Sequence, residues 1–253
     1  SSRIKSYLIK KMPASSNFNQ AIREAQSSSI VGPNVVQKAL PYVGGGMALT
    51  AFGALGGLTL SQSSIYGPLF LVAIIAQLVL FFVASSAANN ANNTKALPLL
   101  ATYSLLTGFT LSGIIAYAAL TIGVGSIATA ALATGITFII ASYTGQRMSD
   151  NVGQALSGVV GLGLIGLVIA MVIQLVGSIF SPAFGTGGFE LLIAGFGTVL
   201  FVAMSFVDFY TMPRRYSDDQ YLAGALGMYL TYINLFVFIL RLMIALNGGG
   251  RRD

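Results

Sequence analysis

The ionisable side chains that could do chemistry in this chain lie inside long apolar stretches. A charge there is costly, so the position of each one is informative. Asp208 lies in one such stretch, five residues before Pro213, and Arg241 lies in the next. An Asp or Arg near the centre of a membrane helix costs about 2.5–3.5 kcal/mol, which favours a bundle-facing position, a partner or the interface. We weigh two interpretations of Asp208: a carboxylate that gates a polar pathway, or one that reaches the interface or pairs with Arg214 or Arg215.

Arg241 allows a simpler interpretation. Its apolar stem can stay in lipid while the guanidinium reaches the outer interface. Glu190, at the start of the preceding apolar stretch, is a plausible partner and would be favoured there by the helix dipole. We therefore expect these two side chains to be secondary polar candidates.

Uncharged polar side chains also occur within the apolar stretches. Tyr229, Thr231 and Asn234 cluster midway along the last stretch, and Gln77 lies in the second. A buried amide needs a partner, so Asn234 and Gln77 predict hydrogen bonds between helices. Tyr229, Thr231 and Asn234 join Asp208 as candidates for a pore or gate.

Composition excludes several kinds of chemistry. The 253 residues contain no Cys or His, which removes thiol, thiolate-metal and imidazole chemistry. Acidic residues are too sparse for a calcium cage, and the glycine run at 44–46 lacks the Lys-Ser/Thr of a phosphate loop. We expect no enzymatic activity, no cofactor and no metal site.

The apolar stretches themselves predict the architecture. A bilayer core needs roughly 20 helical residues to cross it, and lipid satisfies no free backbone groups. We place seven spans at 40–61, 66–87, 96–120, 126–146, 153–180, 189–212 and 221–246. The chain is thus predicted to be an all-α membrane protein with seven transmembrane helices, whose first partner is the lipid bilayer. Residues 1–38 form a polar, basic tail and 39–253 the transmembrane domain.

Basic residues predict the orientation. Ten of the thirteen Lys and Arg residues fall in the tail and in alternate connections. The positive-inside rule then puts the N-terminus in the cytoplasm, or in the equivalent compartment. An odd number of spans puts Arg251 and Arg252 outside; six spans with a re-entrant last segment is the alternative. The net charge of +6 is explained by these connections, so we expect no nucleic-acid partner.

Shorter patterns complete the predictions. Residues 3–12 could lie on a membrane surface, or be solvated or bound to a partner, and 17–26 could form a short helix. The tail has no signal-peptide pattern, so we expect no cleavable signal peptide. Small-xxx-small pairs at Gly53 with Gly57 and at Ser157 with Gly161 predict tight helix packing. Pro213 is expected to end the sixth span.

The last two spans resemble the end of the Bax-inhibitor-motif membrane proteins. The segments are 204–213 (MSFVDFYTMP) and 227–236 (GMYLTYINLF), and 107–117 (TGFTLSGIIAY) is similar to the family's third helix. Asp208 matches the acidic position of the sixth helix. The last-helix motif is matched by Tyr229, Ile233, Asn234, Leu235 and Phe236. The likeness covers about residues 40–253.

The resemblance implies a Bax-inhibitor-type bundle with a central last helix wrapped by the other six. Some members leak calcium in a pH-dependent way, and two aspartates on the last helices share a proton and close the cytoplasmic mouth. Here Thr231 stands where the second aspartate is expected, which is more like the bacterial YccA branch, a partner of the membrane AAA protease FtsH. The resemblance therefore implies a partner or modulator of a membrane protease complex. The alternatives are a calcium or proton leak channel gated around Asp208, or a structural subunit of a larger membrane complex.

Overall fold

The structure is a computed structural model that describes residues 30–181 and 187–248. In this part of the chain the elements are α3 (Val35–Leu60), α4 (Tyr66–Asn89), α5 (Asn93–Thr121), α6 (Val124–Gly145), α7 (Asp150–Phe180), α8 (Gly188–Arg215), the short 3₁₀ helix η2 (Asp218–Gln220) and α9 (Tyr221–Gly248). Each of the seven α-helices is long and apolar enough to cross a membrane. The predicted all-α, seven-span architecture is confirmed, and the last span is one continuous helix.

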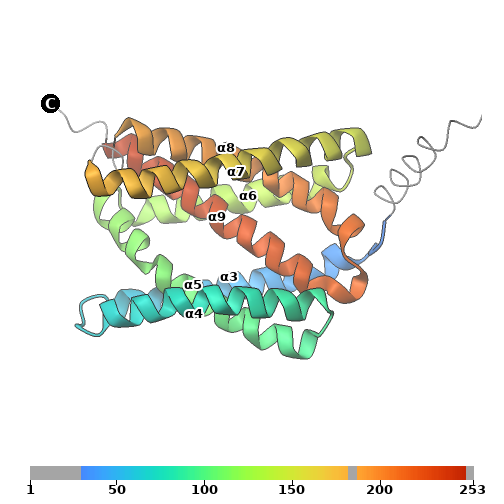
Figure 1. Cartoon of the computed structure of the whole chain (residues 1–253), viewed down its shortest axis with the longest axis horizontal. Coiled ribbons are helices and arrows are strands. Elements are labelled where there is room, and N and C mark those ends of the chain that lie inside the picture. The colour runs from blue at the N-terminus through green and yellow to red at the C-terminus, as the bar shows by residue number, and fades with distance from the viewer. Residues whose placement is uncertain (1–29, 182–186, 249–253) are drawn as a thin grey trace, which may run out of the picture.

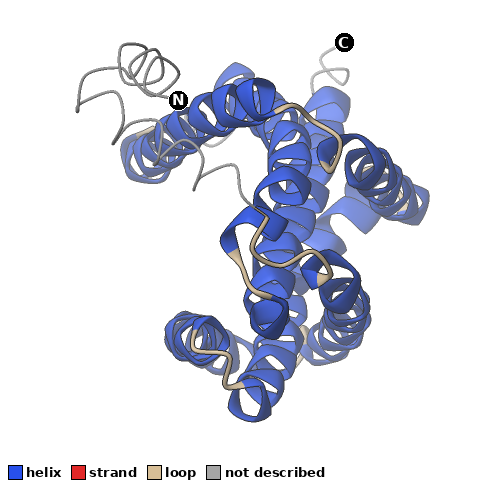
Figure 2. Ribbon diagram, turned by 90° about the vertical axis from the view of Figure 1, so that its right-hand side faces the viewer, coloured by secondary structure: helices blue, strands red, loops and turns tan. Residues whose placement is uncertain are grey.

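The helices form two groups around the last one. Figure 1 shows α6, α7 and α8 on one side, α3, α4 and α5 on the other, and α9 crossing between them. Helix α9 packs against α3, α4, α5, α6 and α8, so the predicted central position of the last helix is confirmed. Helix α7 packs on α8 at the edge of the bundle. Figure 2 looks along the bundle and shows the short loops that join the helices.

The outer helices are built to face lipid. Helix α7 buries only Gly153, Val160 and Leu167, which recur every seven residues and form one narrow strip along it. Large apolar side chains elsewhere on this helix are exposed, among them Leu162 and Leu175. Soluble monomers rarely expose large contiguous apolar patches, and in a helix long enough to cross a membrane this face belongs in the hydrocarbon core.

Glycine allows the closest helix contact, between α3 and α5. A Cβ added to Gly53 would lie 2.0 Å from the Leu105 carbonyl oxygen, and one added to Gly57 would lie 2.4 Å from Ser112 Oγ. The predicted packing role of this pair is confirmed. The matching prediction for Gly161 on α7 is wrong, because a Cβ there would have no neighbour within 4 Å.

Several helix boundaries differ from the sequence predictions by a few residues, and two of these differences are informative. Helix α3 begins at Val35, before the expected start of the first span. Helix α8 continues through Pro213 to Arg215, so the prediction that this proline ends the span is wrong. Proline removes only its own N–H, and the next turn still closes, with the Tyr216 N–H donating to the Met212 carbonyl at 3.0 Å.

The first described residues fasten α3 to the connection between α8 and α9. The N–H groups of Val31 and Gly32 donate to the Pro213 carbonyl at 2.8 and 3.0 Å. The backbone N–H and side-chain amide of Asn34 donate to the two carboxylate oxygens of Asp218. We call this end of the molecule, where the α4–α5, α6–α7 and α8–α9 connections also lie, the basic end. The helices expected at 3–12 and 17–26, and the terminal Arg251 and Arg252, lie outside the described residues.

Candidate functional site

Asp208 lies where α8 meets α9. The Thr231 side chain, 3% exposed on α9, is its hydrogen-bonding neighbour. The Asp208 Oδ2 atom is buried and has no hydrogen-bond partner in the described part of the chain. The structure thus turns this carboxyl toward the last helix, and it brings together the two positions that the resemblance had singled out.

The same carboxyl lines a groove between α7 and α8. The groove has a volume of about 580 Å³ and opens to the surface of the molecule. Its walls combine apolar surface with polar and charged groups, and they come from Gln154, Ser157, Met204, Val207, Asp208, Tyr210, Thr211, Arg214 and Arg215. On α8 these residues follow the helical spacing of three and four, so they form one stripe that leads from Arg215 down to Asp208. Asp208 therefore has α9 on one side and, on the other, an open groove that contains polar and charged groups.

Neither arginine near Asp208 pairs with it. Arg214 forms an ion pair with Asp150 of α7 (Nη2 to Oδ1, 3.0 Å), and its Nη1 donates to the Tyr210 carbonyl at 2.8 Å. The Arg215 guanidinium lies 5.4 Å from the centre of the Tyr216 ring. Pairing of Asp208 with Arg214 or Arg215, one of the two interpretations of this acid, is not what the structure shows.

Asp150 is the charged residue that sequence reasoning missed. It stands in the first turn of α7, where an acid is favoured by the helix dipole, and this position was the available signal. Its Oδ1 accepts from the Tyr210 hydroxyl at 3.1 Å as well as from Arg214. Arg214 also stacks over the Tyr210 ring at 4.0 Å. This cluster holds the start of α7 against the end of α8, beside the groove.

A second ionic cluster lies at the opposite end of the bundle. Arg241 of α9 donates to both carboxylate oxygens of Glu190 on α8, through Nε and Nη2, each at 2.8 Å. Gln174 of α7 accepts from Arg241 at 3.1 Å and donates to Glu190. The predicted Glu190–Arg241 pairing is confirmed, and the cluster joins three helices.

Hydroxyl and amide groups join α3, α4, α5 and α9 inside the bundle. The Tyr229 hydroxyl lies 2.6 Å from Thr50 Oγ1, and Thr50 donates to backbone carbonyls. Gln77 donates to Thr107 at 2.9 Å and accepts from Thr110 at 3.0 Å, as the prediction of a bond between helices requires.

Asn234 behaves differently from Gln77. Its amide donates to the Leu230 carbonyl of its own helix at 2.8 Å. The expected bond between helices is therefore not the one that the structure shows. An amide can bond to the carbonyl four residues earlier wherever its helix is already in place, so this side chain need not join two helices.

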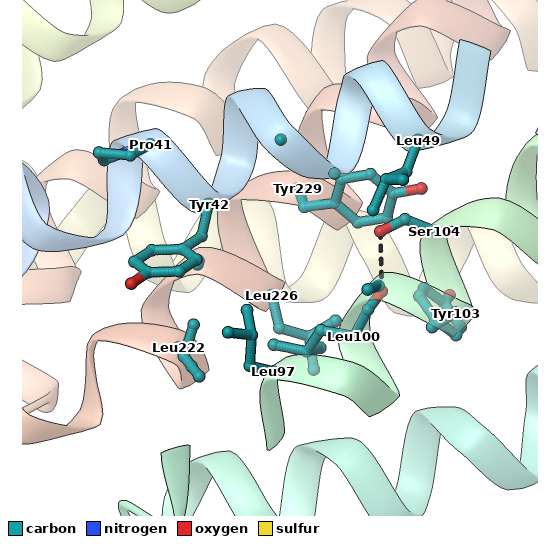
Figure 3. A pocket seen from close by; sticks show the side chains of 14 residues that line it. Pro41, Tyr42, Leu49, Leu97, Leu100, Tyr103, Ser104, Leu222, Leu226 and Tyr229 are labelled. Carbon is teal, nitrogen blue, oxygen red and sulfur yellow. Dashed lines mark hydrogen bonds between the residues drawn. The ribbon is translucent and has the colours of Figure 1, made fainter. Parts of the chain in front are cut away.

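A separate cavity lies next to Tyr229, between α3, α5 and α9 (Figure 3). It has a volume of about 130 Å³ and its walls are almost entirely apolar. Tyr42, Leu97, Leu100, Leu222 and Leu226 surround it in Figure 3, with Tyr229 and Ser104 at one end. An apolar cavity of this size can stay dry, so we assign it no role in moving ions.

The fold and this site define a class: an all-helical membrane protein with a central last helix and an acidic side chain where the last two helices meet. The family described as "Inhibitor of apoptosis-promoting Bax1" matches residues 32–248. The chain therefore belongs to the Bax inhibitor family of integral membrane proteins.

Individual relatives agree with this assignment. An uncharacterized membrane protein of Streptococcus pyogenes serotype M1 is 33% identical over 189 residues, which cover 72% of this chain and 74% of the relative. Bax inhibitor 1 of Schizosaccharomyces pombe is 37% identical over 54 residues, 21% of this chain and 20% of the relative. Protein lifeguard 4 of Mus musculus is 33% identical over 58 residues, 23% and 24% of the two chains. The family thus includes both bacterial and eukaryotic proteins similar to this one.

Proposed function

We propose that the protein is a passive cation pathway, for calcium ions or protons, in which Asp208 is the site that a cation must pass. The observation that carries the proposal is that this acid borders two regions. It lines the open groove between α7 and α8, and it also faces Thr231 on α9. A membrane-embedded acid without a basic partner is a functional site by default. The proposed role is non-enzymatic, since positioning a charge along a pathway requires no bond to be made or broken.

Thr231 stands where two-aspartate relatives have a second acid, and this difference should change how the proposed pathway responds to pH. Two carboxylates at close range cannot both ionise easily, so they share a proton and titrate as a pair. Asp208 has a hydroxyl as its neighbour instead, so the proposed pathway has no such pair. We therefore propose a leak that lacks the coupled pH switch of two-aspartate relatives.

Flux measurements in liposomes test the pathway. Asp208→Asn should change calcium or proton flux through the reconstituted protein, because it removes the negative charge beside Thr231 where a cation is proposed to pass. Asp219→Asn is the matched control, since Asp219 is an exposed acid at the same end of the molecule. Equal, background-level flux in the unsubstituted protein and in Asp208→Asn would overturn the proposal.

A second candidate is a YccA-like partner or modulator of a membrane AAA protease of the FtsH type. It is favoured by the place at which the tail enters the bundle. Val31, Gly32 and Asn34 are bonded to Pro213 and Asp218, so the described part of the chain begins at the basic end. If that tail is the handle, deleting residues 1–28 should abolish co-purification with the protease. Unchanged association and turnover would remove this role.

A structural subunit of a larger membrane complex is the third candidate. Stable co-purification of other subunits in mild detergent would favour it over a solitary channel. It would also leave flux at background in every variant, which separates it from the first proposal.

The membrane and orientation are proposals as well. We propose a bacterial cytoplasmic membrane, with the mitochondrial inner membrane as the alternative, and the basic end in the cytoplasm or matrix. The chain has no Cys, so single substitutions can report on each side. With an impermeant thiol reagent on intact cells, Ser64→Cys should react and Gln146→Cys should be protected. The reverse pattern would invert the orientation.

A further inference from the structure

We propose that the groove between α7 and α8 binds the headgroup of an aminophospholipid, with its phosphate among the arginines at the rim and its ammonium directed toward Asp208. Binding itself does not require that the protein conducts ions. The proposal depends on the charges of the groove, on its size and on the surface that continues from it.

The charges of the groove are separated along its length. Arg214 and Arg215 lie at its rim at the basic end, where lipid headgroups meet the ends of the spans. Asp208 lies six and seven residues deeper, about 9–11 Å along the helix axis. A ligand that carries a phosphate and an ammonium complements this order of charges, whereas a purely anionic headgroup would leave Asp208 without a counter-charge.

The rim still has hydrogen-bonding capacity. Arg215 is exposed and has no ion pair within the described residues. Arg214 keeps its Nη groups on Asp150 and Tyr210, which fixes the guanidinium at the rim without neutralising Arg215. A free guanidinium offers paired donors that suit a phosphate. Arg215 is thus the principal phosphate ligand in this proposal.

The surface of α7 beyond the groove favours a lipid over a free phosphate compound. Gly158 and Gly161 follow Gln154 and Ser157 on the same helical face, and a Cβ at either glycine would have no neighbour within 4 Å. Ile165, 60% exposed, continues this face toward the opposite end. An acyl chain can lie along a helix surface that lacks side chains at two successive turns, directly below a headgroup in the groove.

The size of the groove agrees with this occupant. Its volume of about 580 Å³ falls within the range of roughly 300–1,000 Å³ that is typical of small-molecule sites. The separate cavity near Tyr229, about 130 Å³, is too small and too apolar for a charged headgroup. The groove therefore has both the charged groups and the volume that a lipid headgroup requires.

A lipid in the groove would also compete with cations for Asp208. This consequence depends on the proposed ion pathway, because it predicts slower flux in membranes rich in aminophospholipid. Lipid binding is accordingly tested without any flux measurement, so that failure of one proposal can be told from failure of the other.

The test is native mass spectrometry of delipidated full-length protein in detergent with three lipids of identical acyl chains. Phosphatidylethanolamine should be retained more strongly than phosphatidylglycerol, which lacks the ammonium, and than phosphatidylcholine, whose ammonium has no N–H. Loss of one charge-assisted contact corresponds to about tenfold in affinity. Arg215→Gln should weaken both phosphatidylethanolamine and phosphatidylglycerol by about that factor, and Asp208→Asn should remove the preference between them.

Matched variants separate the groove from general charge effects. Arg147→Gln removes the same charge at the same end, but Arg147 stacks on Tyr143 at 3.7 Å and does not line the groove. It should leave binding unchanged. Gly161→Leu should weaken binding of all three lipids without altering charge, since it occupies the acyl-chain path. Addition of inorganic phosphate should not displace the lipid.

Three outcomes would overturn the proposal. They are equal retention of the three lipids by the unsubstituted protein, equal effects of Arg147→Gln and Arg215→Gln, and displacement by inorganic phosphate. Thermal unfolding of each variant in the same detergent shows that it is folded. A variant that unfolds is replaced by Thr211→Val, which changes a different groove residue and should weaken binding in the same direction.

Discussion

At the opposite end of the bundle, Arg241 is bonded to Glu190 and Gln174, whereas near the basic end Asp208 meets a hydroxyl and an open groove. Both regions place charge within the membrane-spanning helices, and both join α8 to α9. In the Glu190–Arg241 cluster, each charged group lies at hydrogen-bonding distance from a group of opposite charge. In the second, the acid has no basic partner among the described residues.

The contrast separates structural charge from functional charge. A paired cluster that ties three helices together stabilises the bundle only while all its members are present. An acid that has no counter-ion adds nothing comparable, and its place inside the membrane needs another explanation, such as contact with a transported ion or a ligand. We therefore expect a substitution in the Glu190–Arg241 cluster to lower stability strongly and to change flux little. A substitution of Asp208 should change flux strongly and stability little.

The largest loss of stability is expected from breaking the Glu190–Arg241 pair. Glu190→Gln leaves a guanidinium that is only 16% exposed without its counter-charge, which should cost about 3 kcal/mol. The free energy of unfolding in detergent measures this effect. Replacing both residues by Leu and Met should cost much less, because no unpaired charge remains. If Glu190→Gln unfolds like the unsubstituted protein, the cluster is not structural.

A smaller loss is expected at the basic end from Asp150→Asn. The Asp150 side chain is 42% exposed, so solvent screens its pair with Arg214, and the cost should be below about 1 kcal/mol. The same unfolding measurement checks it, and raising the salt concentration should reduce the difference further. A loss as large as that of Glu190→Gln would remove the contrast between the two clusters.

Much of this arrangement could be predicted from the sequence, because it depends on local patterns. The spans follow from lengths of apolar sequence, and the Glu190–Arg241 pair follows from their places at the same end of neighbouring helices. The contact of Gly53 with Leu105 could be anticipated from the spacing of small residues. These features depend on one helix or on the order of two.

Other features depend on how a helix is rotated, which one sequence does not fix. Gly161 belongs to the same kind of small-residue pair as Gly53, yet it lies on the open side of α7. Arg214 was considered as a partner for Asp208. The turn between α6 and α7 instead places Asp150 next to Arg214, with Oδ1 at 3.0 Å from Nη2. The groove depends on both features: the open small-residue face of α7 at the edge of the bundle, and an acid on α8 that has no basic partner among the described residues.

The smallest effect on stability, and the sharpest test of the contrast, is expected from Asp208→Asn. The amide keeps an oxygen that can accept from Thr231 and removes the need to hold a charge where Oδ2 is buried without a partner. The free energy of unfolding should thus stay within about 1 kcal/mol of the unsubstituted protein or rise. The same variant should show the largest change in ion flux and in lipid preference. Because Glu190→Gln should show the reverse, low stability with unchanged lipid preference, the two variants measured side by side distinguish a charge that stabilises the fold from one that binds an ion or a lipid.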